Sequence, residues 1–184
     1  MPSEARKKFD IALADVDAHI SHARSFAGGT RGAPAAVGGV RRPGRPFTHA
    51  AAVLLASALE GYVEAVVAET ATEFNMPVDQ LKDLREQIRY SHGANVRQVH
   101  ALTAQIGLPF VLDTIGWNGL PAGGVRKLLG DLSNRRNKIA HGSAPKEARV
   151  GEVVRWRNLS QRLTVELDKK CSVAIKAKTG AAPW

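Results

Sequence analysis

The sequence contains one cysteine, Cys171, and only 5% of its residues are aromatic. One cysteine cannot form an internal disulfide, and Cys171 has no metal-ligating neighbours, so we expect neither a disulfide framework nor a metal site. The longest apolar run, residues 50–56, is far too short to cross a bilayer. The N-terminus carries charges without an apolar segment, so no signal peptide is expected. These absences favour a cytoplasmic protein that is not embedded in a membrane.

Acidic residues are scarce in the last third of the chain. Residues 120–184 carry 14 Lys and Arg against 5 Asp and Glu, whereas residues 47–119 carry 4 against 8. A basic segment of this kind attracts polyanions such as RNA, DNA or anionic lipid. A solvated basic face is the alternative interpretation, and composition alone does not separate the two.

Glycine and proline interrupt the chain most densely over residues 27–46. This segment also holds four arginines and no acidic residue, so its composition predicts a flexible basic linker. A helix over residues 1–26 precedes it, and a helical bundle over residues 47–176 follows. We expect the helix and the bundle to form one domain, because a single helix is unlikely to stand alone.

Apolar residues recur at helical spacing through most of the remaining sequence, and no stretch shows sustained strand alternation. The predicted fold is therefore an all-α bundle of five or six helices. Thr48 and Asn95 are the predicted N-caps of two of these helices. The helices are expected over residues 4–25, 48–74, 78–91, 96–106, 121–141 and 146–176, with a packed connector over 108–124 that includes one helical turn and a frayed tail after 176.

Residues 131–145, DLSNRRNKIAHGSAP, bring an arginine, an amide and a histidine together at a predicted helix end. Because a helix advances ~100° per residue, Arg136 projects close to the apolar stripe of its helix. An arginine beside a core needs an anionic partner, since an unpaired buried charge is very costly. The acidic helix in the middle of the chain offers Glu60 or Glu64 for this ion pair.

His141 follows Arg136 by five residues, which places it ~140° around the helix and ~7.5 Å along it. Asn137 lies one turn before His141 and could orient the imidazole ring. A histidine exchanges protons near neutral pH, and an arginine can bind a phosphate and stabilise developing charge. Together they could cleave an RNA phosphodiester without a metal, with the 2′-hydroxyl as nucleophile. The alternative interpretation is a structural ion pair at Arg136 and a capping histidine.

The run Arg136-Asn137-Lys138-Ile139-Ala140-His141 resembles the R-x4-6-H signature of the HEPN superfamily, including its usual polar residue after the arginine. The resemblance covers roughly residues 47–170. Within the superfamily, the sequence is similar to the RiboL-PSP-HEPN branch and to a related branch. It implies an HEPN-like helical bundle that dimerises, so that the arginine and histidine of two protomers meet in one cleft and cut RNA without a metal or other cofactor. The other segments that carry it are residues 54–62, residues 96–117 and the leucine-rich run before Arg136.

By this motif, Arg136 and His141 would be catalytic and Asn137 supporting, and Glu60 matches an acidic position on the packing helix. The resemblance predicts an endoribonuclease acting as a homodimer in a toxin–antitoxin or phage-defence setting, with an antitoxin protein encoded nearby as a partner. The alternative is a non-catalytic helical module that binds RNA or a partner protein. The residues expected to contact RNA outside the catalytic pair are Arg135, Lys138, Arg155 and Arg157.

Two further groups have a functional and a structural interpretation. His19 and His22, with Asp15, have helical spacing that could bind a transition metal, but no fourth ligand is apparent and a solvated polar face is favoured. Trp156 lies between two arginines and could stack on a base. A tryptophan on an amphipathic helix is more often packed against a neighbouring element.

Overall fold

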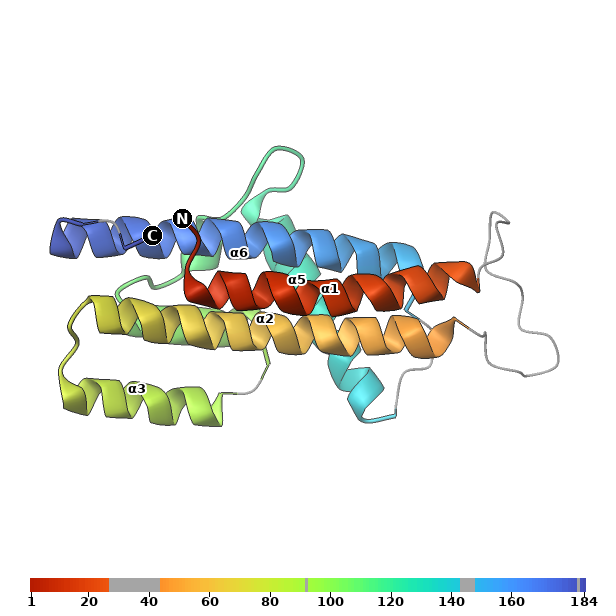
Figure 1. Cartoon of the computed structure of the whole chain (residues 1–184), viewed down its shortest axis with the longest axis horizontal. Coiled ribbons are helices and arrows are strands. Elements are labelled where there is room, and N and C mark those ends of the chain that lie inside the picture. The colour runs from red at the N-terminus through yellow and green to blue at the C-terminus, as the bar shows by residue number, and fades with distance from the viewer. Residues whose placement is uncertain (27–43, 92, 143–147, 182) are drawn as a thin grey trace.

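A computed structural model describes residues 1–26, 44–91, 93–142, 148–181 and 183–184 (Figure 1). Within these residues the fold is all-α, as predicted, and strand pairing is limited to one isolated bridge between Trp117 and Leu120. Most of the predicted linker lies outside the described residues. The elements are α1 (Glu4–Ser25), α2 (Arg45–Glu73), α3 (Val78–Tyr90), α4 (Val96–Gln105), the 3-10 turn η1 (Val111–Asp113), α5 (Ala122–Ala140) and α6 (Val150–Thr179).

Three long helices, α1, α2 and α6, lie side by side and form the main body of the molecule (Figure 1). The helix α1 places one apolar stripe, whose members recur at helical spacing, against both α2 and α6, and these members are buried. Burial of each such side chain contributes about 1.5–3 kcal/mol before entropic costs are counted. The buried members are Phe9, Leu13, Val16 and Ile20.

The helix α2 begins at Arg45, so the prediction that Thr48 is its N-cap is wrong. Pro46 occupies the first turn of α2. The N–H group that a proline lacks would have no partner within the helix at this position, and the fixed φ of proline suits a helix. The Thr48 hydroxyl instead donates to the carbonyl of Arg45 at 3.0 Å. At its other end α2 stops where Asn75 adopts a positive φ of 49°, just before Pro77.

By length and composition alone α2 could cross a membrane, since an 18-residue window has a mean hydropathy of 1.6. Half of that window is buried inside the fold. A core helix of a bundle passes the same test, because a helix that is apolar on most sides is the one placed at the centre of a core. Leu55, Leu59 and Val66 show this, since none of them has measurable exposure.

The shorter helices α3 and α4 both pack against α2. The predicted cap of α4 is confirmed, because the Asn95 side chain accepts a hydrogen bond from the Gln98 amide at 3.0 Å. The connector after α4 contains the single helical turn that was expected, η1. Phe110 precedes this turn in a left-handed conformation with φ 53°, and two thirds of its surface is exposed.

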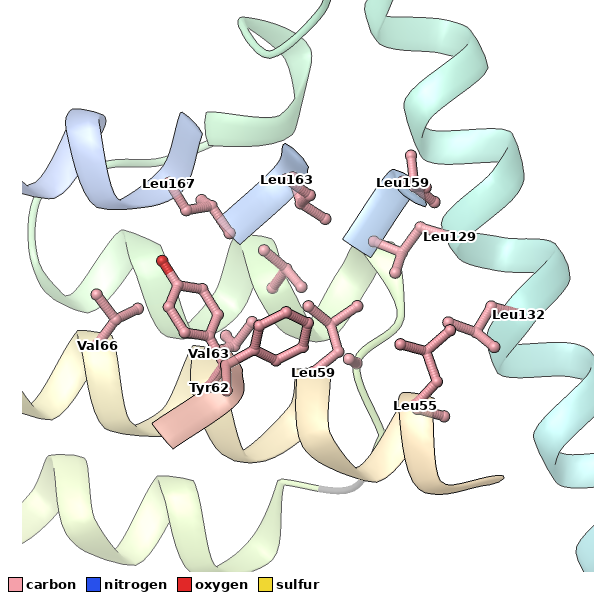
Figure 2. Close-up of a cluster of buried hydrophobic side chains, with 14 of the residues drawn as sticks. Leu55, Leu59, Tyr62, Val63, Val66, Leu129, Leu132, Leu159, Leu163 and Leu167 are labelled. Carbon is pink, nitrogen blue, oxygen red and sulfur yellow. The ribbon is translucent and has the colours of Figure 1, made fainter. Parts of the chain in front are cut away.

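The helix α5 crosses the long helices steeply, and its C-terminal end projects beyond α2 on the side of α3 (Figure 1). Figure 2 shows its leucines meeting the core between α2 and α6. Leu129 and Leu132 are fully buried against this cluster, which anchors the middle of the helix. In the last turn Ile139 still packs partly buried against the core, whereas Asn137 and Lys138 beside it are exposed.

The helix α6 differs from the prediction at both ends. It begins at Val150 rather than at residue 146, because Arg149 has extended dihedrals and its amide donates to Glu152 at 2.7 Å. It continues to Thr179 and ends at Gly180, which has a positive φ of 82°. The described residues at the chain end differ from the predicted frayed tail, since the Trp184 indole donates to the carbonyl of Asp168 at 3.4 Å.

Candidate active site

The C-terminal turn of α5 carries the residues that the sequence singled out. Gly142 follows this turn with a positive φ of 65°, a conformation that favours glycine and stops the helix there. His141 is the C-cap, and its amide donates to the Asn137 carbonyl at 3.0 Å. The predicted helix end is therefore confirmed within one residue. It places His141 on the last turn, where the helix dipole favours a cation.

Arg136 is half-buried and His141 is exposed. The Arg136 guanidinium donates from Nη1 to Oδ1 of Asn137 at 3.2 Å. Within the described part of the chain this is its one hydrogen bond, so most of its N–H groups remain available to an anion. Asn137 thus positions the arginine. Among the described residues no hydrogen bond joins Asn137 to the His141 ring, so its predicted role in orienting that ring stays a prediction.

The predicted ion pair between Arg136 and an acid of α2 is wrong for the residues that the structure describes. The Glu60 carboxylate accepts a hydrogen bond from the amide of Gly93, in the connection between α3 and α4. Among those residues no carboxylate lies within 4.0 Å of the Arg136 guanidinium. Glu60 therefore supports the α3–α4 connection, and Arg136 does not clamp α5 to α2.

The other residues expected to contact RNA have different surroundings. Arg135 is half-buried, with Nη2 4.0 Å from Glu152 Oε1, so it links α5 to the start of α6. Lys138 is exposed on the last turns of α5. Arg155 is also exposed, and its Nε donates to the Gly151 carbonyl at 3.3 Å.

Arg157 is not available to RNA in the way the sequence suggested. Its guanidinium forms a two-pronged pair with Asp17 of α1, with Nε–Oδ1 at 2.9 Å and Nη2–Oδ2 at 2.8 Å. The remaining nitrogen donates to Gln161 at 2.5 Å. Arg157 is therefore a tie between α6 and α1, which corrects its predicted role.

The remaining candidates have structural roles. Trp156 is 4% exposed and packs in the core, so it does not stack on a base. The rings of His19 and His22 lie against Phe47, with centroids 6.1 and 5.4 Å away. Among the described residues no group of three His, Cys, Asp or Glu side chains is arranged to hold a metal ion.

Sequence reasoning did not identify the buried Asp168, which is 3% exposed on α6. Its signal was present, because Asp168 falls between Leu167 and Cys171 on the apolar face of that helix. An acid at such a position needs hydrogen-bond donors from other elements. Asp168 lies among core residues, whereas Arg136 and His141 are not members of the hydrophobic core. Neither Arg136 nor His141 lines the cavity beside the chain termini or the cavity between α3 and α4.

The chain matches no protein-family model, no curated protein and no solved structure. The HEPN resemblance therefore depends on the motif residues of α5. The all-α fold agrees with it but is shared by many unrelated proteins.

Proposed function

We propose that this protein is a metal-independent endoribonuclease of HEPN type that acts as a homodimer. The observation that supports the proposal is the end of α5, where a half-buried arginine with available N–H groups and an exposed histidine share one helix terminus. Asn137 holds the arginine from the adjacent position. An arginine so placed can bind a phosphate through two N–H groups, and the histidine follows it ~7.5 Å farther along the helix.

In the proposed reaction His141 takes the proton of an RNA 2′-hydroxyl, whose oxygen attacks the adjacent phosphorus. The bond from phosphorus to the 5′-oxygen breaks, which leaves a cyclic phosphate on one fragment. The departing 5′-oxygen needs a proton, which a second imidazole can supply. Arg136 stabilises the extra negative charge that develops on the phosphate. One copy of the chain offers a single His141, so a site completed by a second copy fits this chemistry.

The homodimer is part of the proposal for this reason. The end of α5 projects from the bundle and is exposed, which suits a two-fold contact that brings two such ends together (Figure 1). We further propose that the enzyme acts in the cytoplasm, in a toxin–antitoxin or phage-defence setting, with an antitoxin protein encoded nearby. These elements follow the HEPN resemblance.

The experiment is cleavage of mixed cellular RNA by the purified protein in excess EDTA. The wild type should cleave, and both His141→Ala and Arg136→Gln should lose activity by about two orders of magnitude or more. His22→Ala, which removes an exposed histidine of α1, is the matched control and should retain activity. Fragments should carry cyclic phosphates, and substrates with 2′-O-methyl groups should resist.

The second candidate is a non-catalytic helical module that binds RNA or a partner protein. It is favoured by the tie between Arg135 and Glu152, which gives this end of α5 a structural role of its own. Under this alternative Arg135→Ala destabilises the protein, because it removes the tie to Glu152, and His141→Ala has little effect. No cleavage by the wild type would reject the nuclease in favour of this module. Retained cleavage in both variants would instead reject the assignment of the catalytic site to Arg136 and His141.

A further inference from the structure

Four basic residues form one row along the exposed face of α6. Arg155, Arg162, Lys169 and Lys176 recur every seven residues, and all four are exposed. Seven residues complete two helical turns to within ~20°, so the four side chains stand about 10.5 Å apart along one face over about 31 Å. The opposite face carries the buried residues of α6, such as those drawn in Figure 2. We call these four residues the α6 basic row.

The charge of this row is only partly compensated. Lys169 pairs with Glu166 at 2.9 Å, one turn away on the same helix. Within the described part of the chain, Arg162 and Lys176 make no ion pair, and Arg155 bonds a backbone carbonyl. The row therefore keeps about three net positive charges along its length.

A solvated helix face usually mixes both signs of charge, and α3 illustrates this. Its exposed Lys82 and Arg85 alternate with acids at positions 79, 83 and 86. The row on α6 is less mixed. Glu166 pairs with Lys169, and Glu152, three residues before Arg155, accepts a hydrogen bond from the Arg149 amide and lies 4.0 Å from Arg135. A one-sign row on a rigid helix attracts a linear polyanion more strongly than a mixed face does.

Arg162 is the most constrained member of the row. Its Cζ lies 4.9 Å from the centroid of the Trp117 ring, which is half-buried in the connector before α5. The connector is itself a tight turn, because the backbones of Trp117 and Leu120 exchange hydrogen bonds at 3.0 and 2.9 Å. This cation–π contact restrains the guanidinium. Within the described part of the chain its N–H groups make no hydrogen bond or ion pair, so they are open to a phosphate.

We propose that the α6 basic row binds the sugar–phosphate backbone of RNA outside the cleavage site. The row binds charge and not sequence, since long flexible cations on a helix contact phosphates without reading base edges. The choice of RNA among polyanions rests on the proposed function, whereas the row itself rests on the spacing, exposure and charge of its members. Arg157 is excluded, because Asp17 holds it on another face of α6.

The test measures binding of a fluorescent 2′-O-methyl RNA oligonucleotide by anisotropy over a series of salt concentrations. This probe lacks the nucleophile, so binding is measured without cleavage. With three to four phosphate contacts, the slope of log K against log salt should be about −2 to −3. The double variant Arg162→Gln with Lys176→Gln should reduce this slope by about 1.4 and weaken binding about tenfold or more at low salt.

The matched control is Lys82→Gln with Arg85→Gln on α3, which removes the same charge from exposed positions. It should leave the slope unchanged, and thermal unfolding should show that both double variants fold. An equal loss of RNA affinity in the two double variants, or no RNA binding by the wild type, would overturn the proposal that the row binds RNA. Row-dependent binding to vesicles of phosphatidylserine and phosphatidylcholine without row-dependent RNA binding would also overturn it, in favour of a membrane surface.

This test separates the row from the nuclease. If the His141→Ala protein binds the probe through the row but the wild type cleaves no RNA, the row stands and the proposed nuclease fails. If the wild type cleaves RNA while the row variant binds the probe as the wild type does, the nuclease stands and the row fails.

Discussion

The carboxylate of Asp168 on α6 accepts two hydrogen bonds from Ser3, which lies at the other end of the sequence. The Ser3 amide donates to Oδ2 at 3.0 Å, and its hydroxyl donates to Oδ1 at 2.5 Å. The buried Tyr62 hydroxyl donates to the Thr164 carbonyl at 2.8 Å and lies 3.3 Å from Asp168 Oδ1. Burial and then the nearby Asp168 raise the pKa of Tyr62 well above its ordinary value. This polar cluster joins α1, α2 and α6.

Asp168→Asn should lower the free energy of unfolding by about 1–3 kcal/mol. The amide replaces one acceptor oxygen by a donor that faces the donors of Ser3, so a buried hydrogen-bonding group loses its partner. Urea unfolding followed by circular dichroism measures the change. Asp15→Asn, at an exposed position of α1, is the control and should change stability by less than about 0.5 kcal/mol. Equal stability of the two variants would show that the cluster does not hold α1 in place.

The pair between Arg157 and Asp17 should contribute modestly to stability. Its geometry is two-pronged, but the Asp17 side chain is 47% exposed, so solvent screens the attraction. A double-mutant cycle with Arg157→Gln and Asp17→Asn should give a coupling energy of about 0.5–1 kcal/mol. Arg157→Gln should leave RNA affinity close to that of the α3 control. A loss as large as that of the row variant would return Arg157 to the RNA-binding surface.

Glu69 should make stability depend on pH. Partial burial is the main cause that raises its pKa above the ordinary value of 4.5, and Asp168 and Glu4 add to it, whereas the Ala5 amide opposes it. The folded state thus binds the Glu69 proton more tightly than the unfolded state does. The contribution of protonated Glu69 to stability is therefore full below the ordinary pKa and is lost as the pH rises through the raised pKa. Glu69→Gln should therefore gain stability relative to the wild type between pH 4 and neutral pH, by roughly a few tenths of a kcal/mol after screening.

Unfolding measured at several pH values checks this result. The control is Glu73→Gln, which replaces an exposed glutamate of the same helix. Its difference from the wild type in free energy of unfolding should not increase as the pH rises. A gain for Glu69→Gln that is largest at acid pH would contradict the direction of the shift.

The Cys171 thiol should be unreactive in the folded protein. Burial is the main cause that raises the pKa of Cys171 to about 11, and the residue has no exposed surface. Thiolate is the reactive species, so a disulfide reagent near pH 8 meets very little of it. Labelling should be slow in buffer and fast in concentrated urea, as measured by release of the chromophore. Rapid labelling of the native protein would indicate that the packing around α6 opens readily.

Activity at the end of α5 should depend on protein concentration if two copies complete the site. Specific activity should fall on dilution below the concentration at which the dimer dissociates, and sedimentation velocity should show the monomer over the same range. The His141→Ala variant should dimerise with the same affinity, which separates loss of assembly from loss of chemistry. Constant specific activity in samples that sediment as monomers would restrict the site to one chain.

The helices and their buried faces follow from the sequence, because apolar spacing of 3–4 residues is a local property that the helix preserves. The stripe of α1 and the end of α5 show this, since both lie where the pattern predicted. The start of α2 shows the limit. Thr48 and Pro46 both signal a helix start. The helix begins at the earlier of the two signals, because a proline suits the first turn.

Side-chain partners were decided only by the tertiary structure. Glu60 bonds the amide of Gly93, and Asp17 binds Arg157 from 140 residues away. A carboxylate can pair with any donor that the fold brings near it, and sequence spacing carries no information about distant helices. For that reason the predicted ion pair of Arg136 failed although its position on α5 was correct.

The sequence by itself determined the seven-residue spacing of the α6 basic row and the order of Arg136, Asn137 and His141, because both are set along a single helix. The tertiary structure decided which side of α6 faces solvent and which end of α5 leaves the core. Burial depends on what packs against a helix, and that arises only when segments distant in sequence assemble.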